Sequence, residues 1–238
     1  MLFNLNVSIF KLFAEIFTSK EYMGMIFEGL GCTLLISFGA TVVGIILGTL
    51  VAVVKIVPAK NPVMKVLNCI CDVYTTVFRG TPMALQLFIM AFVVFAIRGF
   101  PMEVVAILAF GINSGAYVSE SIRAGILSVD VGQTEAGRAL GLSYGTTMWK
   151  IVIPQAIKNV IPAIGNEIIA LIKETSIVSM VGGLYDLTLV AKIIGGGNEL
   201  ANFLVPMTVV ALFYLAIVYS LTFVIKLIER RLRASDKR

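Results

Sequence analysis

The sequence contains no histidine and few charged residues, and both shortages narrow the classes of protein that it can represent. Without histidine, the chain can form neither an imidazole metal site nor an imidazole general base. Charged residues make up only 14% of the chain, against about 25% in an ordinary soluble domain. Hydrophobic residues make up 58%, and the mean hydropathy is +0.97. This balance predicts an all-α integral membrane protein rather than a soluble protein with an unusually large core.

Several chemical sites are also missing from the sequence. It lacks the G-x-x-x-x-G-K-[ST] loop that cradles nucleotide phosphates. Cys32, Cys69 and Cys71 lie in or near apolar segments without zinc-type spacing, which favours reduced cysteines that pack in the protein. No nucleophile–base pair stands out, so we expect a chain that is not an enzyme and has no metal or cofactor of its own. The net charge of +5 fits the cytoplasmic ends of membrane helices better than nucleic-acid binding.

Long apolar segments are the main feature that is present. A helix needs about 20 residues to cross the hydrocarbon core of a bilayer. Four segments reach that length: 25–54, 66–97, 102–127 and 203–226. Between the last two lie shorter apolar stretches, 156–172 and 177–194, and the second of these contains glycines, Asp186 and Lys192. We predict one crossing by 156–172, a break at 173–176, and then a re-entrant or surface helix.

Basic residues predict how these helices are oriented. Lys55, Lys60 and Lys65 separate the first two apolar segments, and "ERRLR" follows the last one. Because lysine and arginine concentrate on the cytoplasmic side, both regions should be cytoplasmic. We therefore predict five transmembrane helices, with the N-terminus outside and the C-terminus inside. The odd number of helices and the lack of an internal repeat suggest one half of a two-fold assembly around a central pathway.

The two ends of the chain are expected to lie outside this transmembrane domain, which we assign to residues 21–228. Residues 1–20 lack the basic start and cleavage site of a signal peptide. Their polar and apolar residues fall on opposite faces of a helix, which predicts an amphipathic helix at the membrane surface; a partly ordered tail is the alternative. Residues 229–238 form a basic cytoplasmic tail. The polar face is Asn4, Ser8, Lys11 and Glu15, and the apolar face is Leu5, Ile9, Leu12, Phe13 and Ile16.

A polar, glycine-rich stretch at about 128–154 carries the start and stop signals of two short helices. Asp130 and Gln133 have the spacing of a capping box, followed by a helix over about 131–140. Gly141 suits the left-handed residue that ends a helix, and Ser143 can cap a second helix. Pro154 suits the first turn of the next span. These signals predict a rigid cytoplasmic protrusion, although capping alone fits equally an ordered loop without a special partner.

Polar residues at membrane depth are candidate functional positions. At about 1.5 Å per residue, Asn113, Ser114 and Tyr117 lie near the middle of the third span, and Asn166 and Glu167 near the middle of the fourth. If the two helices are neighbours, these residues face one another and offer a carboxylate, amides and hydroxyls to an amino acid. Interhelical hydrogen bonding is the alternative role, above all for Asn113 and Ser114. An unpaired Glu167 favours a basic amino acid as substrate, unless Lys173 pairs with it.

Charged residues near these positions have simpler interpretations. Glu120 and Arg123 have the i,i+3 spacing of a structural ion pair, which could also contribute to an inner gate. Arg79 interrupts the second apolar segment and could line the pathway or anchor the helix. Gly80 and Pro82 beside it predict a local distortion of that span.

Five stretches of the chain, in order, resemble the permease subunits of ATP-binding-cassette importers, in particular the polar amino-acid uptake branch. Within them, Glu135, Ala136, Gly137 and Gly141 are followed by Pro154 at the spacing of the family's EAA loop. Gly137 replaces the usual second alanine of that loop, and Ile153 replaces the usual leucine. The resemblance covers roughly residues 26–228. The stretches are "VFRGTPMALQLF" (77–88), "AYVSESIRAGILSV" (116–129), "GQTEAGRALGLS" (132–143), "IPQA" (153–156) and "NEIIALIKETSIVS" (166–179).

The resemblance implies a type I importer permease fold in the bacterial inner membrane. By it, Glu135, Ala136, Gly137, Gly141 and Pro154 couple the chain to a cytoplasmic ATPase dimer, which uses the ATP. It also implies a second permease copy or paralogue, an extracytoplasmic substrate-binding protein and contact with lipid. The competing hypothesis is a stand-alone secondary amino-acid transporter or channel, with a broken helix at 173–176.

Overall fold

The structure, a computed structural model, describes residues 2–59, 61–196 and 200–234, with side chains from Ile9 and, in the last range, from Phe203. Every regular element in these ranges is a helix, which confirms the predicted all-α class. Short π-type segments occupy Met90–Val94 and Met148–Val152, and a 3₁₀ segment occupies Thr175–Met180. The α-helices are α1 (Leu2–Thr18), α2 (Lys20–Ile56), α3 (Pro62–Gly80), α4 (Met83–Ile89), α5 (Met102–Leu127), α6 (Val131–Ala139), α7 (Tyr144–Thr147), α8 (Ile153–Glu174), α9 (Leu187–Ile194) and α10 (Leu200–Ala234).

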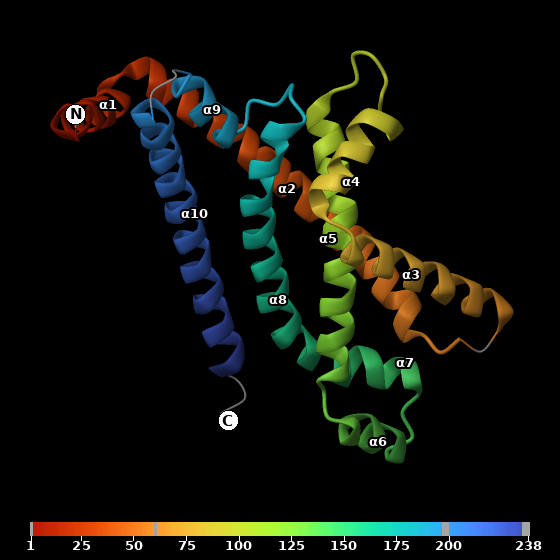
Figure 1. Ribbon diagram of the computed structural model, residues 1–238. Coiled ribbons are helices and arrows are strands. Elements are labelled where there is room, and N and C mark those ends of the chain that lie inside the picture. The colour runs from red at the N-terminus through yellow and green to blue at the C-terminus, as the bar shows by residue number, and fades with distance from the viewer. Residues whose placement is uncertain (1, 60, 197–199, 235–238) are drawn as a thin grey trace.

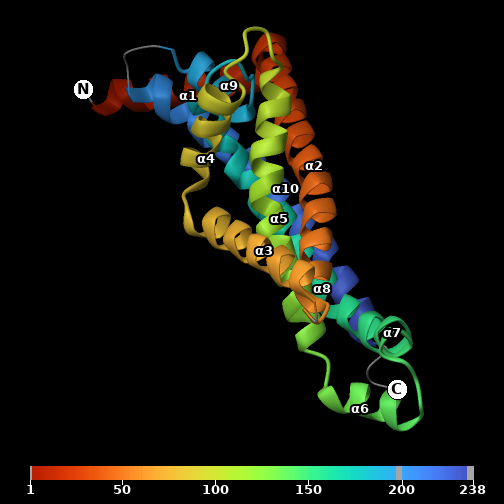
Figure 2. The same ribbon diagram turned by 90° about the vertical axis from the view of Figure 1, so that its right-hand side faces the viewer.

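The long helices connect two distinct ends of the molecule. In Figure 1, α5, α8 and α10 run between an upper end, which holds α1 and α9, and a lower end, which holds α6 and α7. The last described turn of α10 lies at the lower end too, on the same side as α6 and α7. The N-terminal helix α1 lies at the opposite end. Figure 2 shows the same separation from a second direction.

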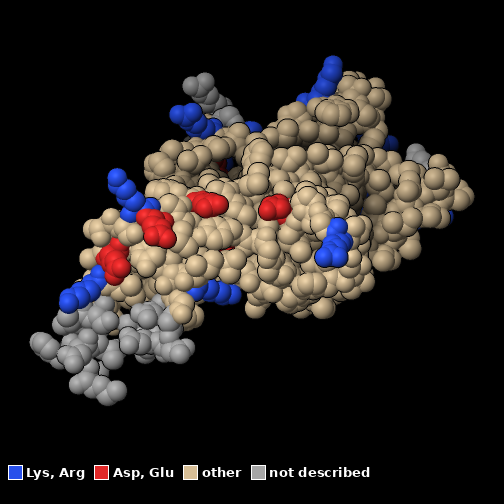
Figure 3. All heavy atoms as spheres, turned by 90° about the horizontal axis from the view of Figure 1, so that it is seen from above, with Lys and Arg blue, Asp and Glu red and all other residues tan. Residues whose placement is uncertain are grey.

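Three helices are long and apolar enough to cross a membrane: α2, α5 and the Phe203–Ala234 part of α10. The bent pair of α3 and α4 counts as a fourth if it is taken as one span. Helix α8, the remaining predicted crossing, has 22 residues, but Lys158, Asn159 and Glu167 interrupt its apolar character. The count of five spans and the orientation of the termini therefore stay predictions. Seen from the upper end, most of the surface carries no charged side chain (Figure 3).

The second apolar segment, 66–97, bends sharply at the point where the sequence predicted a distortion. Helix α3 ends at Gly80 and α4 begins at Met83, and the two are bent by 109° at this break. Pro82 has no N–H to continue the ladder of hydrogen bonds, and the residue before a proline avoids the helical region. The distortion predicted at Gly80 and Pro82 is thus present, but as a right-angled elbow that sends α3 out to the side (Figure 1).

Helices α2 and α5 make the most extensive contact between two helices in the described part of the chain. Glycines allow their backbones to approach closely. A methyl group added at Gly48 would lie 2.7 Å from Val118, and one added at Gly111 would lie 2.6 Å from Val43. A larger residue at either position would push the helices apart. Small residues four apart, as at Gly44 and Gly48, let helix backbones approach closely inside a membrane. The pair therefore forms a rigid frame for the rest of the molecule.

The predicted helix in residues 1–20 is present as α1, and part of its apolar face lies against protein. Ile16 is fully buried. Ile9, Leu12 and Phe13 pack around a cluster that includes residues of α9 and α10, such as Val190. The side chains of residues 4, 5 and 8, which belong to the same prediction, lie outside the described set. Phe10 is 75% exposed and Phe17 is 45% exposed, so apolar side chains are left for lipid, and the location of α1 at a membrane surface stays a prediction.

The chain changes its course after the predicted fourth span where the sequence indicated. Helix α8 ends at Glu174 and the chain tightens into a 3₁₀ turn at Thr175, within the predicted break at 173–176. The short helix α9 then starts at Asp186, whose carboxylate accepts hydrogen bonds from the backbone N–H groups of Thr188 and Leu189. The backbone N–H of Leu187 also donates to the Thr33 hydroxyl on α2. This hydrogen bond fixes the start of α9 against the bundle.

Candidate functional site

The polar stretch after α5 forms the predicted helix–turn–helix, and we call residues 130–147 the handle. The Asp130 carboxylate accepts from the Gly132 N–H at 2.7 Å and starts α6. Gly141 ends that helix with φ of +77°, a region that residues with a Cβ avoid. The Ser143 hydroxyl accepts from the Thr146 N–H at 3.2 Å and starts α7. The handle projects beyond the lower ends of the long helices (Figures 1 and 2).

The handle differs from the prediction in the role of Gln133. We expected its side chain to complete a capping box with Asp130. Instead, the Gln155 amide on α8 donates to the Gln133 side-chain oxygen at 3.3 Å. The first turn of α6 is thus joined to α8 rather than closed on itself. The spacing of Asp130 and Gln133 indicates a capping box, but it does not reveal that Gln155 competes for the Gln133 side chain.

The second short helix is not separate from the long helix that follows. Helix α7 continues through the π-type turn Met148–Val152 into α8, and the Ile153 N–H reaches back five residues to the Met148 carbonyl. Pro154 follows in the first turn of α8, where its missing N–H removes one bond from the regular α-helical ladder. A wider turn of this kind inserts a single extra residue in a continuous helix. A movement of α7 is therefore passed directly to α8.

The predicted coupling residues occupy two different environments. Glu135 and Ala136 are exposed on α6, and Gly141 in the turn and Pro154 on α8 are exposed as well. Gly137 is buried, and a methyl group added there would lie 2.8 Å from both Thr147 Oγ1 and Thr147 Cγ2. The glycine that replaces the family's alanine thus lets α6 pack closely on α7. Glu135 and Ala136, which precede Gly137 on α6, form the exposed side of the handle.

The residues predicted near the midplane do not form one cluster. Ser114 on α5 is buried and lies beside the Glu167 carboxyl on α8. Asn166, the neighbour of Glu167, is exposed on α8. Helices α5 and α8 are neighbours as expected, but Ser114 is the α5 residue that meets Glu167.

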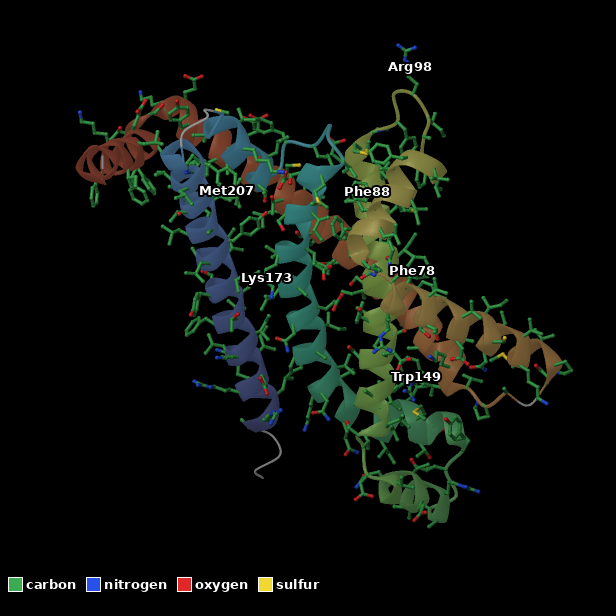
Figure 4. All side chains as sticks on the ribbon, viewed as in Figure 1. Phe78, Phe88, Arg98, Trp149, Lys173 and Met207 are labelled. Carbon is green, nitrogen blue, oxygen red and sulfur yellow. The ribbon has the colours of Figure 1, made fainter. Side chains whose placement is uncertain are left out.

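Asn113 faces the elbow between α3 and α4 instead. Its side-chain amide donates to the Phe78 carbonyl at 3.0 Å and to the Gln86 side-chain oxygen at 2.9 Å. The Gln86 amide in turn donates to the carbonyls of Phe78 and Thr81. Pro82 has no N–H to donate to the Phe78 carbonyl, and Thr81 lies outside both helices, so the two amides satisfy these carbonyls. Figure 4 shows Phe78 at the point where α3 meets the bundle.

Tyr117 shares this side of α5, and its ring contacts a cation. The Arg79 guanidinium lies 5.4 Å from the ring centroid and 3.9 Å from the Glu120 carboxylate. Of the two roles considered for Arg79, the structure supports the anchoring one. Tyr117 is 38% exposed, so it remains accessible beside the elbow.

Glu120 is the centre of a larger ion network than the predicted pair. Arg123 donates to it at 3.0 Å, as expected. Lys55 at the end of α2 is also 2.7 Å from Glu120 and 3.1 Å from Asp72 on α3. With Arg79, the network joins three helices and contains three cations and two carboxylates. The sequence marked Lys55 only as a sign of orientation, because a contact between residues 65 positions apart leaves no local pattern.

Comparison with known proteins gives a consistent family. The sequence model of the binding-protein-dependent transport system inner membrane component matches residues 40–234. The arginine transport system permease protein ArtQ of Bacillus subtilis is 42% identical over 213 residues, which is 89% of this chain and 94% of that protein. The putative glutamine transport system permease protein GlnP of Rickettsia bellii is 42% identical over 212 residues, 88% of this chain and 94% of that protein.

Solved structures agree with these relatives. A crystal structure described as an amino acid ABC transporter with histidines contains a chain that matches with a TM-score of 0.80 and 36% identity, over 89% of this chain and 95% of that one. A chain of the methionine transporter MetNI, at 20% identity, matches with a TM-score of 0.73 over 90% of this chain and 99% of that one, and supports the fold alone. These matches and the apolar helices confirm a multi-pass protein of the bacterial inner membrane. The chain belongs to the binding-protein-dependent transport system inner membrane component family.

Proposed function

We propose that this chain is the permease subunit of an ATP-driven amino-acid importer, and that the handle couples it to a cytoplasmic ATPase. The chain itself hydrolyses no ATP and needs no cofactor. It works with a second permease copy or paralogue, an ATPase dimer and an extracytoplasmic substrate-binding protein. The carrying observation is the capped handle, which is continuous with α8 through Met148–Val152. Relatives named as arginine and glutamine permeases support the amino-acid substrate.

The geometry of the handle supports its role in coupling. Exposed Glu135 and Ala136 on α6 offer a small, partly acidic contact surface. Beneath it, Gly137 lets α6 rest on Thr147 of α7, and the Gln155–Gln133 hydrogen bond ties α6 to α8. A force applied to the outer side of α6 would therefore reach α8, which carries Glu167. A floppy loop would absorb such a force in its own bending.

The arrangement of the ends supports the orientation proposed from charge. The handle and the last described turns of α10, which include Arg231 and Arg233, lie at the same end of the molecule. Basic residues mark the cytoplasmic side, so we infer five crossings with the N-terminus outside. Helix α3 extends from the bundle with exposed apolar residues along its length, for example Val66, Ile70 and Val73. Contact with a second permease copy would cover such a surface.

The Ser114–Glu167 pair supports a cationic substrate. Glu167 has no cationic partner among the described residues, and a carboxylate at membrane depth is costly unless a positive group approaches it. Lys173, the internal alternative, is exposed. An arginine, lysine or histidine side chain would supply the missing charge, with Ser114 as a nearby hydrogen-bonding group. Asn113 and Tyr117 belong to the elbow, so any contact that they make with substrate occurs on the other side of α5.

The stand-alone transporter has less support. The arguments for it are the interrupted region 155–195, in which α8 gives way to a 3₁₀ turn after Glu174, and the position of Glu167. The relatives ArtQ and GlnP, in contrast, are named as permease proteins of transport systems. A stand-alone carrier would also have no use for a rigid handle at the cytoplasmic end.

Docking on the ATPase can be tested with two tryptophan substitutions. Ala136→Trp enlarges an exposed residue of α6, and Ala216→Trp makes the same change at an exposed residue of α10. Both variants and the wild-type chain are expressed with their ATPase and purified through a tag on the permease. We expect the ATPase to co-purify with the wild type and with Ala216→Trp and to be lost from Ala136→Trp. Undiminished recovery of the ATPase with Ala136→Trp would show that α6 is not the docking surface.

A further inference from the structure

Two cavities meet where the handle joins the helix bundle. The first has a volume of about 320 Å³ and is lined by Lys55, Arg123, Thr134 and Tyr144 together with apolar residues. The second has a volume of about 250 Å³ and is lined almost entirely by apolar residues, among them Val53 and Trp149. Four residues line both cavities, so the two adjoin: Ile56, Ile126, Tyr144 and Met148.

The polar cavity has the features of an anion site. Its lining contains Lys55 and Arg123, both of which are paired with Glu120 outside the cavity, and no aspartate or glutamate. Arg123 uses Nε and Nη2 towards Glu120, which leaves the two donors on Nη1 without a partner among the described residues. The hydroxyls of Thr134 and Tyr144 add two neutral donors. A planar guanidinium with free donors is well suited to a phosphate oxygen.

The apolar cavity continues from this site along the ends of the helices. Ile56 is the last residue of α2, and Ile126 lies one residue before the end of α5. Trp149, on the turn between α7 and α8, is 73% exposed and lies at the handle end of the bundle (Figure 4). Tryptophan is enriched at the boundary between hydrocarbon and water. The apolar cavity, which we call the groove, therefore lies at the depth where the acyl chain of a lipid joins its headgroup.

We propose that these two cavities together bind one anionic phospholipid, with its phosphate at Arg123 and Tyr144 and the upper part of an acyl chain between Val53 and Trp149. A free phosphate would fill only the polar cavity and leave the apolar one empty. A bound lipid contacts α2, α5 and α7 at once, so it holds the handle against the bundle. The inference rests on the proposed orientation of the handle and is independent of which amino acid is transported.

The groove can be filled without disturbing its walls at Gly145. This glycine lines the apolar cavity, and no heavy atom lies within 4 Å of a Cβ added there. Gly145→Leu therefore occupies the path of the acyl chain while leaving the helix free to form. Gly24 on α2 is equally open, is absent from the lining of both cavities and lies near the start of that helix, so Gly24→Leu is the matched control.

The test measures retained lipid on the complete transport complex. The complex is equilibrated in liposomes of phosphatidylglycerol and phosphatidylcholine in equal parts, extracted gently, and analysed by native mass spectrometry. We expect phosphatidylglycerol to be retained in preference to phosphatidylcholine. Retention should fall about tenfold in Gly145→Leu, equivalent to about 1.4 kcal/mol, and stay unchanged in Gly24→Leu. The melting temperature in phosphatidylcholine alone should be the same for all three proteins.

Three results would overturn the proposal. Equal retention of the two lipids by the wild type would remove the headgroup site, whatever the variants do. Displacement of phosphatidylglycerol by inorganic phosphate at equilibrium would identify a phosphate site instead. Retention by the permease alone but not by the complete complex would identify the groove as part of the ATPase contact. Failure of amino-acid uptake with normal lipid retention would count against the proposed function and leave the lipid site standing.

Discussion

The Asn113 side-chain amide on α5 donates to the Gln86 side-chain oxygen on α4 at 2.9 Å, and both amides reach the Phe78 carbonyl at the end of α3. This pair fixes the elbow, because it supplies the donors that the proline at position 82 cannot. Without them, buried carbonyls would lie in an apolar surrounding without hydrogen bonds. A residue that the sequence marked for substrate binding thus has a structural role.

The elbow should therefore depend on both amides. Gln86→Leu leaves the Phe78 and Thr81 carbonyls with fewer donors, and each buried group without a partner destabilises by about 1–3 kcal/mol. We expect a clear fall in the thermal midpoint of the purified complex. Asn113→Leu should cause a similar fall, and the loss in the double variant should differ from the sum of the two single losses, because the two residues share one network. Strictly additive losses would show that the amides act independently.

The ion network gives a second, graded prediction. Lys55→Met removes the 2.7 Å bond to Glu120, whose side chain is only 19% exposed; loss of such a charged hydrogen bond should destabilise by about 2 kcal/mol. Asp72→Asn removes the other partner of Lys55, but Asp72 is 65% exposed. Exposed ion pairs contribute about 0–1 kcal/mol, so its effect should be small. Equal losses in thermal unfolding for the two variants would contradict this order.

The turn of the handle can be tested by its backbone conformation alone. No heavy atom lies within 4 Å of a Cβ added at Gly141, but φ is +77°. Valine in this left-handed region is strained by about 1–2 kcal/mol, whereas asparagine tolerates it. We expect Gly141→Val to lower the amount of substrate transported per ATP hydrolysed by roughly 5–30-fold, and Gly141→Asn to lower it far less. If valine and asparagine give the same ratio as glycine, the turn does not control coupling.

Glu167 should decide the charge of the preferred substrate. Glu167→Gln keeps the shape of the side chain and removes its charge, so a cationic substrate loses a charge-assisted contact. We expect the preference for arginine over glutamine in uptake assays to fall about tenfold. Glu103→Gln, at the first turn of α5, is the matched control and should leave the preference unchanged. A Glu167→Gln variant with wild-type preference would remove this residue from the site.

Local signals in the sequence were sufficient for the handle. The cap at Asp130, the left-handed Gly141 and the cap at Ser143 are formed as predicted, because each depends only on residues within a few positions. The Gln133 prediction failed for the opposite reason: its amide bonds to Gln155 on another helix. Short-range chemistry is readable from one sequence, and competition from a distant partner is not.

The elbow and the pairing of α5 with α8 show the same limit at a larger scale. Hydropathy depends only on composition, so it identifies 66–97 as one apolar segment. It gives no sign of the 109° bend within that segment. Position along the helix singled out Asn113 and Ser114, but it gave no information on the direction that each side chain faces. Adjacent residues on a helix are rotated by about 100°, so Ser114 meets α8 while Asn113 meets α4. The glycines at 44 and 48 were a usable signal for close helix packing that hydropathy alone passes over.

The most direct measurement of the central claim is accumulation of arginine in proteoliposomes that contain the chain, with its binding protein and ATP on the appropriate sides. With the ATPase subunit present, we predict accumulation above the external concentration that stops when ATP is omitted. Without the ATPase, we predict no accumulation. Arginine uptake of equal extent by the chain alone would contradict its role as the permease subunit of an ATP-driven importer.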